Sequence, residues 1–139
     1  MSFYHIKNTL ETYINQNITD VAIAWSNTNA ITINNVSLTD EEKSALNYYI
    51  EPVIVPSSDD REIIGSANGV KYEAYVLIKI YTKMNTGTGM LYQLLNRVDG
   101  LLREKVIDMC TYEKSVTSGG YQEDEWFVMP YKVLYSYWG

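Results

Sequence analysis

The stretch from Val70 to Thr82 constrains the fold more than any other part of the chain, because its side chains alternate between two sets. One set is almost entirely apolar and comprises Val70, Tyr72, Ala74, Val76, Ile78 and Ile80. The other set mixes charged, aromatic and aliphatic residues: Lys71, Glu73, Tyr75, Leu77, Lys79 and Tyr81. Successive side chains of a strand point to opposite faces of the sheet, so the first set predicts a face on a hydrophobic core. The second set is too apolar in its middle for a fully solvated face, which favours coverage by something else, such as another subunit.

A Thr-Gly-Thr-Gly break follows this strand and leads into a one-sided helix, which we expect over residues 90–105. The apolar positions of that helix fall on one stripe: Leu91, Leu94, Leu95, Val98, Leu101, Leu102 and Val106. Gly100 lies inside the helix, where glycine costs up to ~1 kcal/mol relative to alanine. We therefore expect a neighbouring backbone to approach closely at Gly100. Helical spacing of apolar residues also predicts a short amphipathic helix over residues 3–16.

Most of the remaining segments have the character of strands. Thr39 and Glu42 have the spacing of a capping box, which predicts a brief helix between two of these strands. Pro52 and Pro130 interrupt two longer extended segments and predict edges or bulges, because proline cannot donate a hydrogen bond to the ladder. The expected extended segments are residues 21–25, 31–34, 48–55, 62–64, 109–116 and 125–138, and Asn68-Gly69 and Ser118-Gly119-Gly120 predict turns.

These elements predict a single domain that spans residues 1–139. A chain of this length with 46% hydrophobic residues is long enough to bury a core without disulfides or metal. The order helix, strands, helix, strands predicts an α+β fold. We expect a mostly antiparallel β-sheet with an N-terminal helix and a central amphipathic helix packed on one face.

Charge and composition argue against several classes of function. The net charge is −6, with 11 basic and 17 acidic residues. A free nucleic-acid-binding protein needs lysine and arginine to displace counterions from phosphates, so this balance argues against that class. Cys110 is the only cysteine and cannot form an internal disulfide. No apolar run approaches the length of a membrane span and the amino terminus lacks a signal-peptide pattern, so we expect a soluble protein that folds inside the cell.

The residue types that usually carry catalysis are few and scattered. His5 is the only histidine, and Cys110 has no basic neighbour in sequence that would lower its pKa. No spacing of histidine and cysteine fits zinc, and the acidic runs do not follow the calcium-loop pattern. Thr86-Gly87-Thr88-Gly89 precedes a helix but lacks the lysine of a phosphate loop, so we interpret it as a loop and helix cap. The sequence favours a protein that is not an enzyme and has no catalytic residue, metal or cofactor.

The order of elements along the chain is more informative than any single residue. An N-terminal helix precedes a Tyr-rich strand that ends at Pro56, and a final strand pair carries Trp126 and a Tyr-Trp ending. In this order, residues 3–137 resemble the tail terminator proteins of long-tailed bacteriophages, which are also called tail completion or tail-to-head joining proteins. The segments that carry the likeness most strongly are Arg61–Gly65, Val70–Ile80 and Gly87–Leu102.

The resemblance implies a structural virion protein of the phage tail or neck, assembled in the host cytoplasm. Members of this family form a hexameric ring that stacks on the last ring of tail-tube subunits and stops tube growth. The implied partners are further copies of the chain, the major tail tube protein and the head–tail connector or neck proteins. DNA passes through the ring without specific binding, and no membrane is involved.

Subunit and partner contacts of such a ring are expected in loops and on strand faces. Thirteen Tyr and three Trp fit this expectation, because these side chains suit surfaces that are wet when free and buried on association. Two other classes remain open: another phage neck protein, such as a head-closure or connector-adaptor protein, and a small α+β enzyme or ligand-binding domain with a deep polar pocket. The candidate contact residues are Asp59, Asp60, Arg61, Tyr75, Leu77, Tyr81, Thr86, Thr88, Tyr121, Tyr135 and Tyr137.

Overall fold

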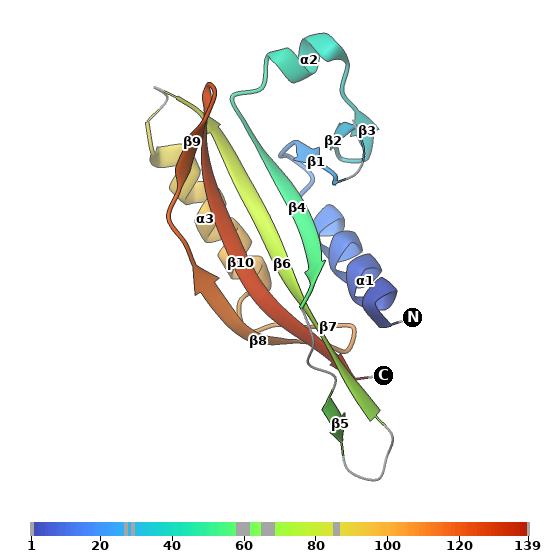
Figure 1. Cartoon of the computed structure of the whole chain (residues 1–139). Helices are drawn as coiled ribbons and strands as arrows, with labels where there is room; N and C mark the ends of the chain where they lie inside the picture. Colours follow the sequence, from blue (N-terminus) through green and yellow to red (C-terminus); the bar gives the residue numbers. More distant parts are fainter. Residues whose placement is uncertain are drawn as a thin grey trace.

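The computed structural model of the chain describes residues 2–26, 28, 30–57, 62–64, 69–84 and 87–138. It confirms the expected α+β class, with a mostly antiparallel sheet and helices (Figure 1). Within the described ranges the helices are α1 (Ser2–Asn17), α2 (Asp40–Ser44) and α3 (Gly89–Leu102). The strands are β1 (Ile23–Ala24), β2 (Ile31–Ile33), β3 (Val36–Ser37), β4 (Tyr48–Pro56), β5 (Glu62–Ile64), β6 (Gly69–Lys83), β7 (Val106–Ile107), β8 (Cys110–Thr117), β9 (Tyr121–Glu123) and β10 (Trp126–Trp138).

One sheet connects these strands in the order β3-β2-β1-β4-β6-β10-β8-β7, with β5 paired to β6 and β9 paired to β10. The pair of β1 and β4 is parallel, and the other strand pairs are antiparallel. The long strands β6 and β10 form the centre and pair from Lys71↔Trp138 to Lys83↔Trp126. The first residues of β6 pair with β5, and Figure 1 shows this pair extending beyond the rest of the sheet.

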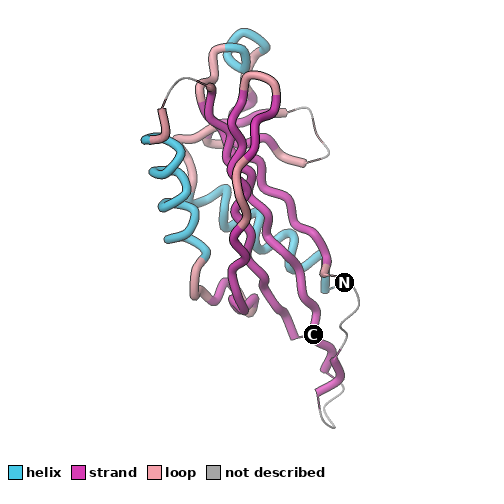
Figure 2. The backbone as a smooth tube through the Cα atoms, turned by 60° about the vertical axis from the view of Figure 1, so that its left-hand side comes forward, coloured by secondary structure: helices cyan, strands magenta, loops and turns pink. Residues whose placement is uncertain are grey.

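Helices α1 and α3 pack on the same face of the sheet, and the two views of the backbone agree on this arrangement (Figure 1 and Figure 2). Their apolar stripes meet the face of β6 that was expected to lie on a core, which confirms that prediction. The residues buried together include Ile6, Leu10 and Ile14 of α1, Leu91, Leu94, Val98 and Leu102 of α3, and Ala74, Val76, Ile78 and Ile80 of β6.

The end of α3 differs from the sequence-based expectation. The helix stops at Leu102, because Arg103 takes an extended conformation and Glu104 a positive φ of 55°. Val106 was expected on the helical stripe, but it lies in β7 with 70% of its surface exposed. The expected backbone contact at Gly100 is also wrong, because a Cβ built on this exposed residue would meet no atom within 4 Å.

The structure confirms the local predictions for the helix cap and for the two strand prolines. Thr39 and Glu42 form the expected capping box at the start of α2. Pro52 lies in β4 beyond Ile50, the residue through which β4 pairs with β1, so the expected edge is confirmed there. Pro130 of β10 lies between the residues that pair with β9 and those that pair with β8. Each proline therefore sits where one side of its strand has no ladder partner in the described structure.

Candidate functional site

The face of the sheet opposite α1 and α3 carries side chains that the helices do not cover. Because Ala74, Val76, Ile78 and Ile80 point toward the helices, the alternate residues of β6 point away from them. Cross-strand partners of those alternate residues share their face. We call this surface the open face and define it by Tyr49, Glu51, Val53, Val55, Glu73, Tyr75, Leu77, Lys79, Tyr81, Lys83, Lys114, Val116, Tyr121, Glu123, Trp126, Val128, Pro130, Lys132, Leu134 and Ser136. It is turned toward the viewer in Figure 1, with α1 and α3 behind the sheet.

Two cross-strand rows form the centre of the open face. The first row joins Val53, Leu77, Lys132 and Val116, and the second joins Val55, Tyr75, Leu134 and Lys114. Most of these side chains are apolar, and the ammonium group of Lys132 lies 4.1 Å from the centre of the Tyr75 ring. A cation over an aromatic face is attracted by the ring quadrupole, so this contact holds the lysine over the apolar surface.

A group of three aromatic rings forms one end of the open face. Tyr49 and Tyr81 are stacked, with ring centres 4.4 Å apart, and Trp126 meets Tyr49 edge-on at 5.1 Å. The Tyr81 hydroxyl donates to Oε1 of Glu51 at 3.2 Å. Burial, followed by the nearby charges of Glu51 and Glu123, raises the pKa of Tyr49 to about 12, so this phenol stays protonated at neutral pH. The three rings therefore form an aromatic cluster in which the Tyr49 phenol is neutral.

Several candidate contact residues lie on the open face. Tyr75 and Leu77 occupy its two central rows and are half-buried, and Tyr121 is exposed beside Val128. Tyr81 also lies on this face, although its neighbours leave only 7% of its surface exposed. The structure therefore brings four of the named residues together on one surface, as the alternation of β6 predicted for three of them.

Tyr135 and Tyr137 lie on the opposite face, among the residues that pack against the helices. Tyr135 is fully buried, so the expectation that it contacts another subunit is wrong for the folded chain. Tyr137 is half-buried and its ring lies 4.4 Å from that of His5. Side chains of β10 alternate between two faces that both carry apolar residues, so the sequence could not tell which of the two faces the helices cover.

The remaining candidates come from loops. Asp59, Asp60, Arg61 and Thr86 lie outside the described residues. Thr88 is exposed at the start of α3, where it is the N-cap residue but makes no side-chain hydrogen bond to the helix. The structure confirms the expected loop and helix start at this position. Thr88 contacts none of the other candidate residues that the structure describes.

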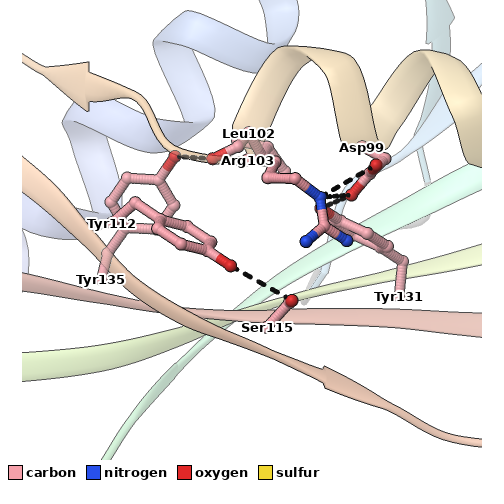
Figure 3. A network of polar contacts seen from close by, with 7 residues as sticks. All are labelled: Asp99, Leu102, Arg103, Tyr112, Ser115, Tyr131 and Tyr135. Atoms are coloured by element: carbon pink, nitrogen blue, oxygen red, sulfur yellow. Dashed lines mark hydrogen bonds and ion pairs between the residues drawn. The ribbon is translucent and has the colours of Figure 1, made fainter.

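The buried tyrosines of β10 tie α3 to the sheet through their hydroxyl groups (Figure 3). Tyr135 donates to the carbonyl oxygen of Leu102, at the last residue of α3. Tyr131 donates to Oδ1 of Asp99 at 2.7 Å, and Arg103 donates to the same carboxylate at 2.9 Å. Burial and the hydrogen bond to Asp99 raise the pKa of Tyr131. These contacts fix the end of the helix on the sheet and have a structural role.

Removing the Tyr135 hydroxyl is expected to destabilise the fold measurably. In a Tyr135→Phe variant the buried carbonyl of Leu102 loses its donor, which should cost about 1–3 kcal/mol of unfolding free energy. Urea unfolding followed by circular dichroism measures this change. Tyr137→Phe is the matched control, because no described residue hydrogen-bonds the Tyr137 hydroxyl, and it should stay within about 0.5 kcal/mol. Equal effects of the two substitutions would contradict the assigned role.

Side chains that could take part in catalysis or hold a metal ion do not converge in the described part of the chain. A groove of about 410 Å³ between α1 and the turn before β8 is lined by His5, Asn8, Thr9, Thr12, Tyr13, Gln16, Ile107 and Asp108. The His5 ring there approaches a backbone carbonyl and the Thr9 hydroxyl, each at 3.4 Å. Cys110 is buried, and burial raises the pKa of its thiol to about 11. Among the described residues, no group of three or more His, Cys, Asp or Glu could hold a metal ion.

Sequence reasoning missed the residues that give the open face its character. Lys132 and Leu134 of β10 and Val53 of β4 join Tyr75 and Leu77 through the strand register. The alternation of β10 is visible in the sequence, but the pairing that aligns Lys132 with Leu77 depends on contacts far apart in the chain. No local signal fixes that register.

No protein-family model matches the sequence. No curated protein matches it either. Among solved structures, one chain whose name states no function aligns with 94% of this chain and 94% of its own length, with a TM-score of 0.60 and 13% identical residues. At that level of identity the similarity shows a shared fold. Within the described ranges, no helix combines the length and apolar character needed to cross a membrane.

Proposed function

We propose that this chain is a structural protein that works as a homo-oligomeric ring, and that the ring caps the tail tube of a long-tailed bacteriophage. The observation that supports the proposal best is the open face. Two helices cover one side of the sheet, while no described helix covers the other side, where Tyr75, Leu77 and Val53 remain partly exposed and Tyr81, Val128 and Leu134 are buried by their neighbours. Contiguous apolar surface of this kind is typical of protein–protein interaction sites.

The ring would end tube growth by geometry. One ring face matches the open end of the tube, and the other face cannot template a further ring of tube subunits. That second face would then receive the head–tail connector or neck proteins. A contact between two different patches of the same chain, repeated with a constant rotation, closes such a ring. DNA would pass through the channel without specific binding, which suits a chain of net charge −6.

Two measurements with purified protein test this function. Light scattering should show a closed oligomer, expected to be a hexamer, either in solution or after addition of tail-tube protein from the same genome. Electron microscopy of tubes polymerised with increasing amounts of the chain should show shorter tubes, each with a ring at one end. A chain that stays monomeric with tubes present and leaves their length unchanged would rule the proposal out. Binding to connector-bearing heads without binding to tubes would instead identify a neck protein.

A further inference from the structure

Residues 30–47, which form most of the segment between β1 and β4, contribute no side chain to the core. Every residue from 30 to 49 is described, and none of them is buried. β2, β3 and α2 form this segment, and Figure 1 shows α2 standing beyond the ends of the neighbouring strands. Ordering such a segment costs conformational entropy, and burial within the chain offsets less of it here than in the core. We call residues 30–47 the lobe, and its stability would gain from an external contact.

The surface of the lobe combines apolar and acidic residues. Val36 is 67% exposed, and Ile33 and Leu38 are half-buried. The lobe contains three acidic residues and one lysine, Asp40, Glu41, Glu42 and Lys43, so its net charge is −2. Glu42 accepts a hydrogen bond from the Thr39 backbone within the capping box, whereas Asp40 and Glu41 are exposed in the first turn of α2.

The centre of the open face has the opposite charge. Its two central rows contain Lys132 and Lys114 and no acidic residue, which gives a net charge of +2 on a chain that is acidic as a whole. Among the described residues, no carboxylate pairs with either lysine. Lys132 is held over the Tyr75 ring, so its charge is presented at a fixed place on an apolar surface.

We propose that the lobe of one copy of this chain docks on the open face of the next copy, with Asp40 and Glu41 opposite Lys132 and Lys114. The apolar part of the contact would bring Val36 against Leu77. Within the lobe, β2 and β3 lie beside β1 at the edge of the sheet and α2 stands beyond the strand ends, away from the two central rows, so the contact joins different molecules (Figure 1). It uses a different patch on each partner, which is the kind of contact that generates a ring. This inference rests on the proposed ring and names its subunit interface.

Charge complementarity favours a second copy over another occupant. Both surfaces belong to the same chain, carry charges of −2 and +2, and place apolar residues beside the charged ones. Complementary potentials fix the register of an interface and exclude wrong partners. The closing of each contact would also cover the lobe, whose side chains are at most partly buried within one copy of the chain.

A charge swap tests the contact. The face variant carries Lys114→Glu and Lys132→Glu, and the lobe variant carries Asp40→Lys and Glu41→Lys. Each variant alone should associate at least about 10-fold more weakly than the wild type, because like charges then oppose one another. An equimolar mixture should assemble again, because every contact in an alternating ring pairs opposite charges. Sedimentation velocity over a range of concentrations measures the association. Lys7→Glu with Lys105→Glu changes the charge equally elsewhere and should leave assembly unchanged.

The outcomes separate this interface from the proposed function. Restored assembly in the mixture also shows that both variants fold. If the variants assemble like the wild type, or if the mixture stays dissociated, the lobe-to-face contact is overturned. If the face variant forms normal oligomers but no longer binds tubes, the open face belongs to the tube protein and the inference is again overturned. A charge-swap pattern in a protein that has no effect on tube length would support this interface and contradict the capping function.

Discussion

Replacing Ile78 by alanine is expected to lower the free energy of unfolding by about 2–5 kcal/mol, because the substitution leaves a cavity in a closely packed core. Ile78 is 1% exposed and lies in the middle of β6, under the two long helices. The preceding residue in the strand, Leu77, points to the open face and is half-buried. Leu77→Ala is the matched control and should cost about 1 kcal/mol, since less apolar area is lost.

Urea unfolding at low protein concentration measures both variants. Dilution matters because association stabilises the folded state and would add to the apparent cost of Leu77→Ala. At high protein concentration, the difference between the unfolding free energies of the two variants should therefore become smaller. If the two substitutions cost the same in the dilute, monomeric chain, then the assignment of the two faces of β6 is wrong.

The parts of the fold that sequence predicts well depend on periodicity alone. Residues 70–82 alternate cleanly, and β6 is found at Gly69–Lys83 with the expected set of side chains in the core. The helix expected over residues 90–105 is α3, and of its expected stripe Leu91, Leu94, Val98 and Leu102 are buried, while Leu95 and Leu101 are half-buried. Such patterns reflect which face of an element meets the core, so they survive in the folded chain whatever the partners are.

Where the prediction fails, tertiary structure overrides the local pattern. Val106 continues the apolar stripe of α3 in sequence, but the positive φ of Glu104 turns the chain into β7. The two-residue strands and β9 are too short to carry a period, and only their partners define them. Tyr135 was expected at an interface because tyrosine suits surfaces that are buried on association, and only the packing of α3 shows that its face of β10 is the inner one.

The residues of the candidate site also divide into those that periodicity predicts and those that only tertiary contacts define. Tyr75 and Leu77 could be recognised from sequence, because the side chains of their strand alternate and their face is more apolar than a fully solvated face would be. Lys132 could not be added to them, since its place beside Leu77 depends on the register between β10 and β6. The lobe was visible only as short segments, and its lack of buried residues is a property of the folded chain. The residues of an interface that combines distant segments can be identified only from the structure, whereas the residues of a single strand face can be predicted from sequence.

A Tyr75→Ala, Leu77→Asp double variant is expected to stay folded and to lose self-association by at least about 100-fold, which corresponds to about 2.7 kcal/mol. The monomer should tolerate an aspartate at position 77, because Lys132 is the direct cross-strand neighbour of that position. The same aspartate would neutralise the lysine that the lobe is proposed to contact and would place a carboxylate in an apolar interface, where desolvation opposes it. Loss of the Tyr75 ring also removes the surface that holds Lys132 in place.

Sedimentation and circular dichroism separate the two effects, and a control on α3 makes the comparison specific. Tyr92→Ala with Gln93→Asp makes the same kind of change at two exposed positions of the helix on the other side of the sheet. This control should assemble like the wild type and keep its unfolding curve. If the Tyr75→Ala, Leu77→Asp chain assembled normally, the open face would have no part in oligomerisation, and the ring would need an interface built from other surfaces. If that chain unfolded while the control did not, the half-buried residues of this face would be part of the monomer's own core.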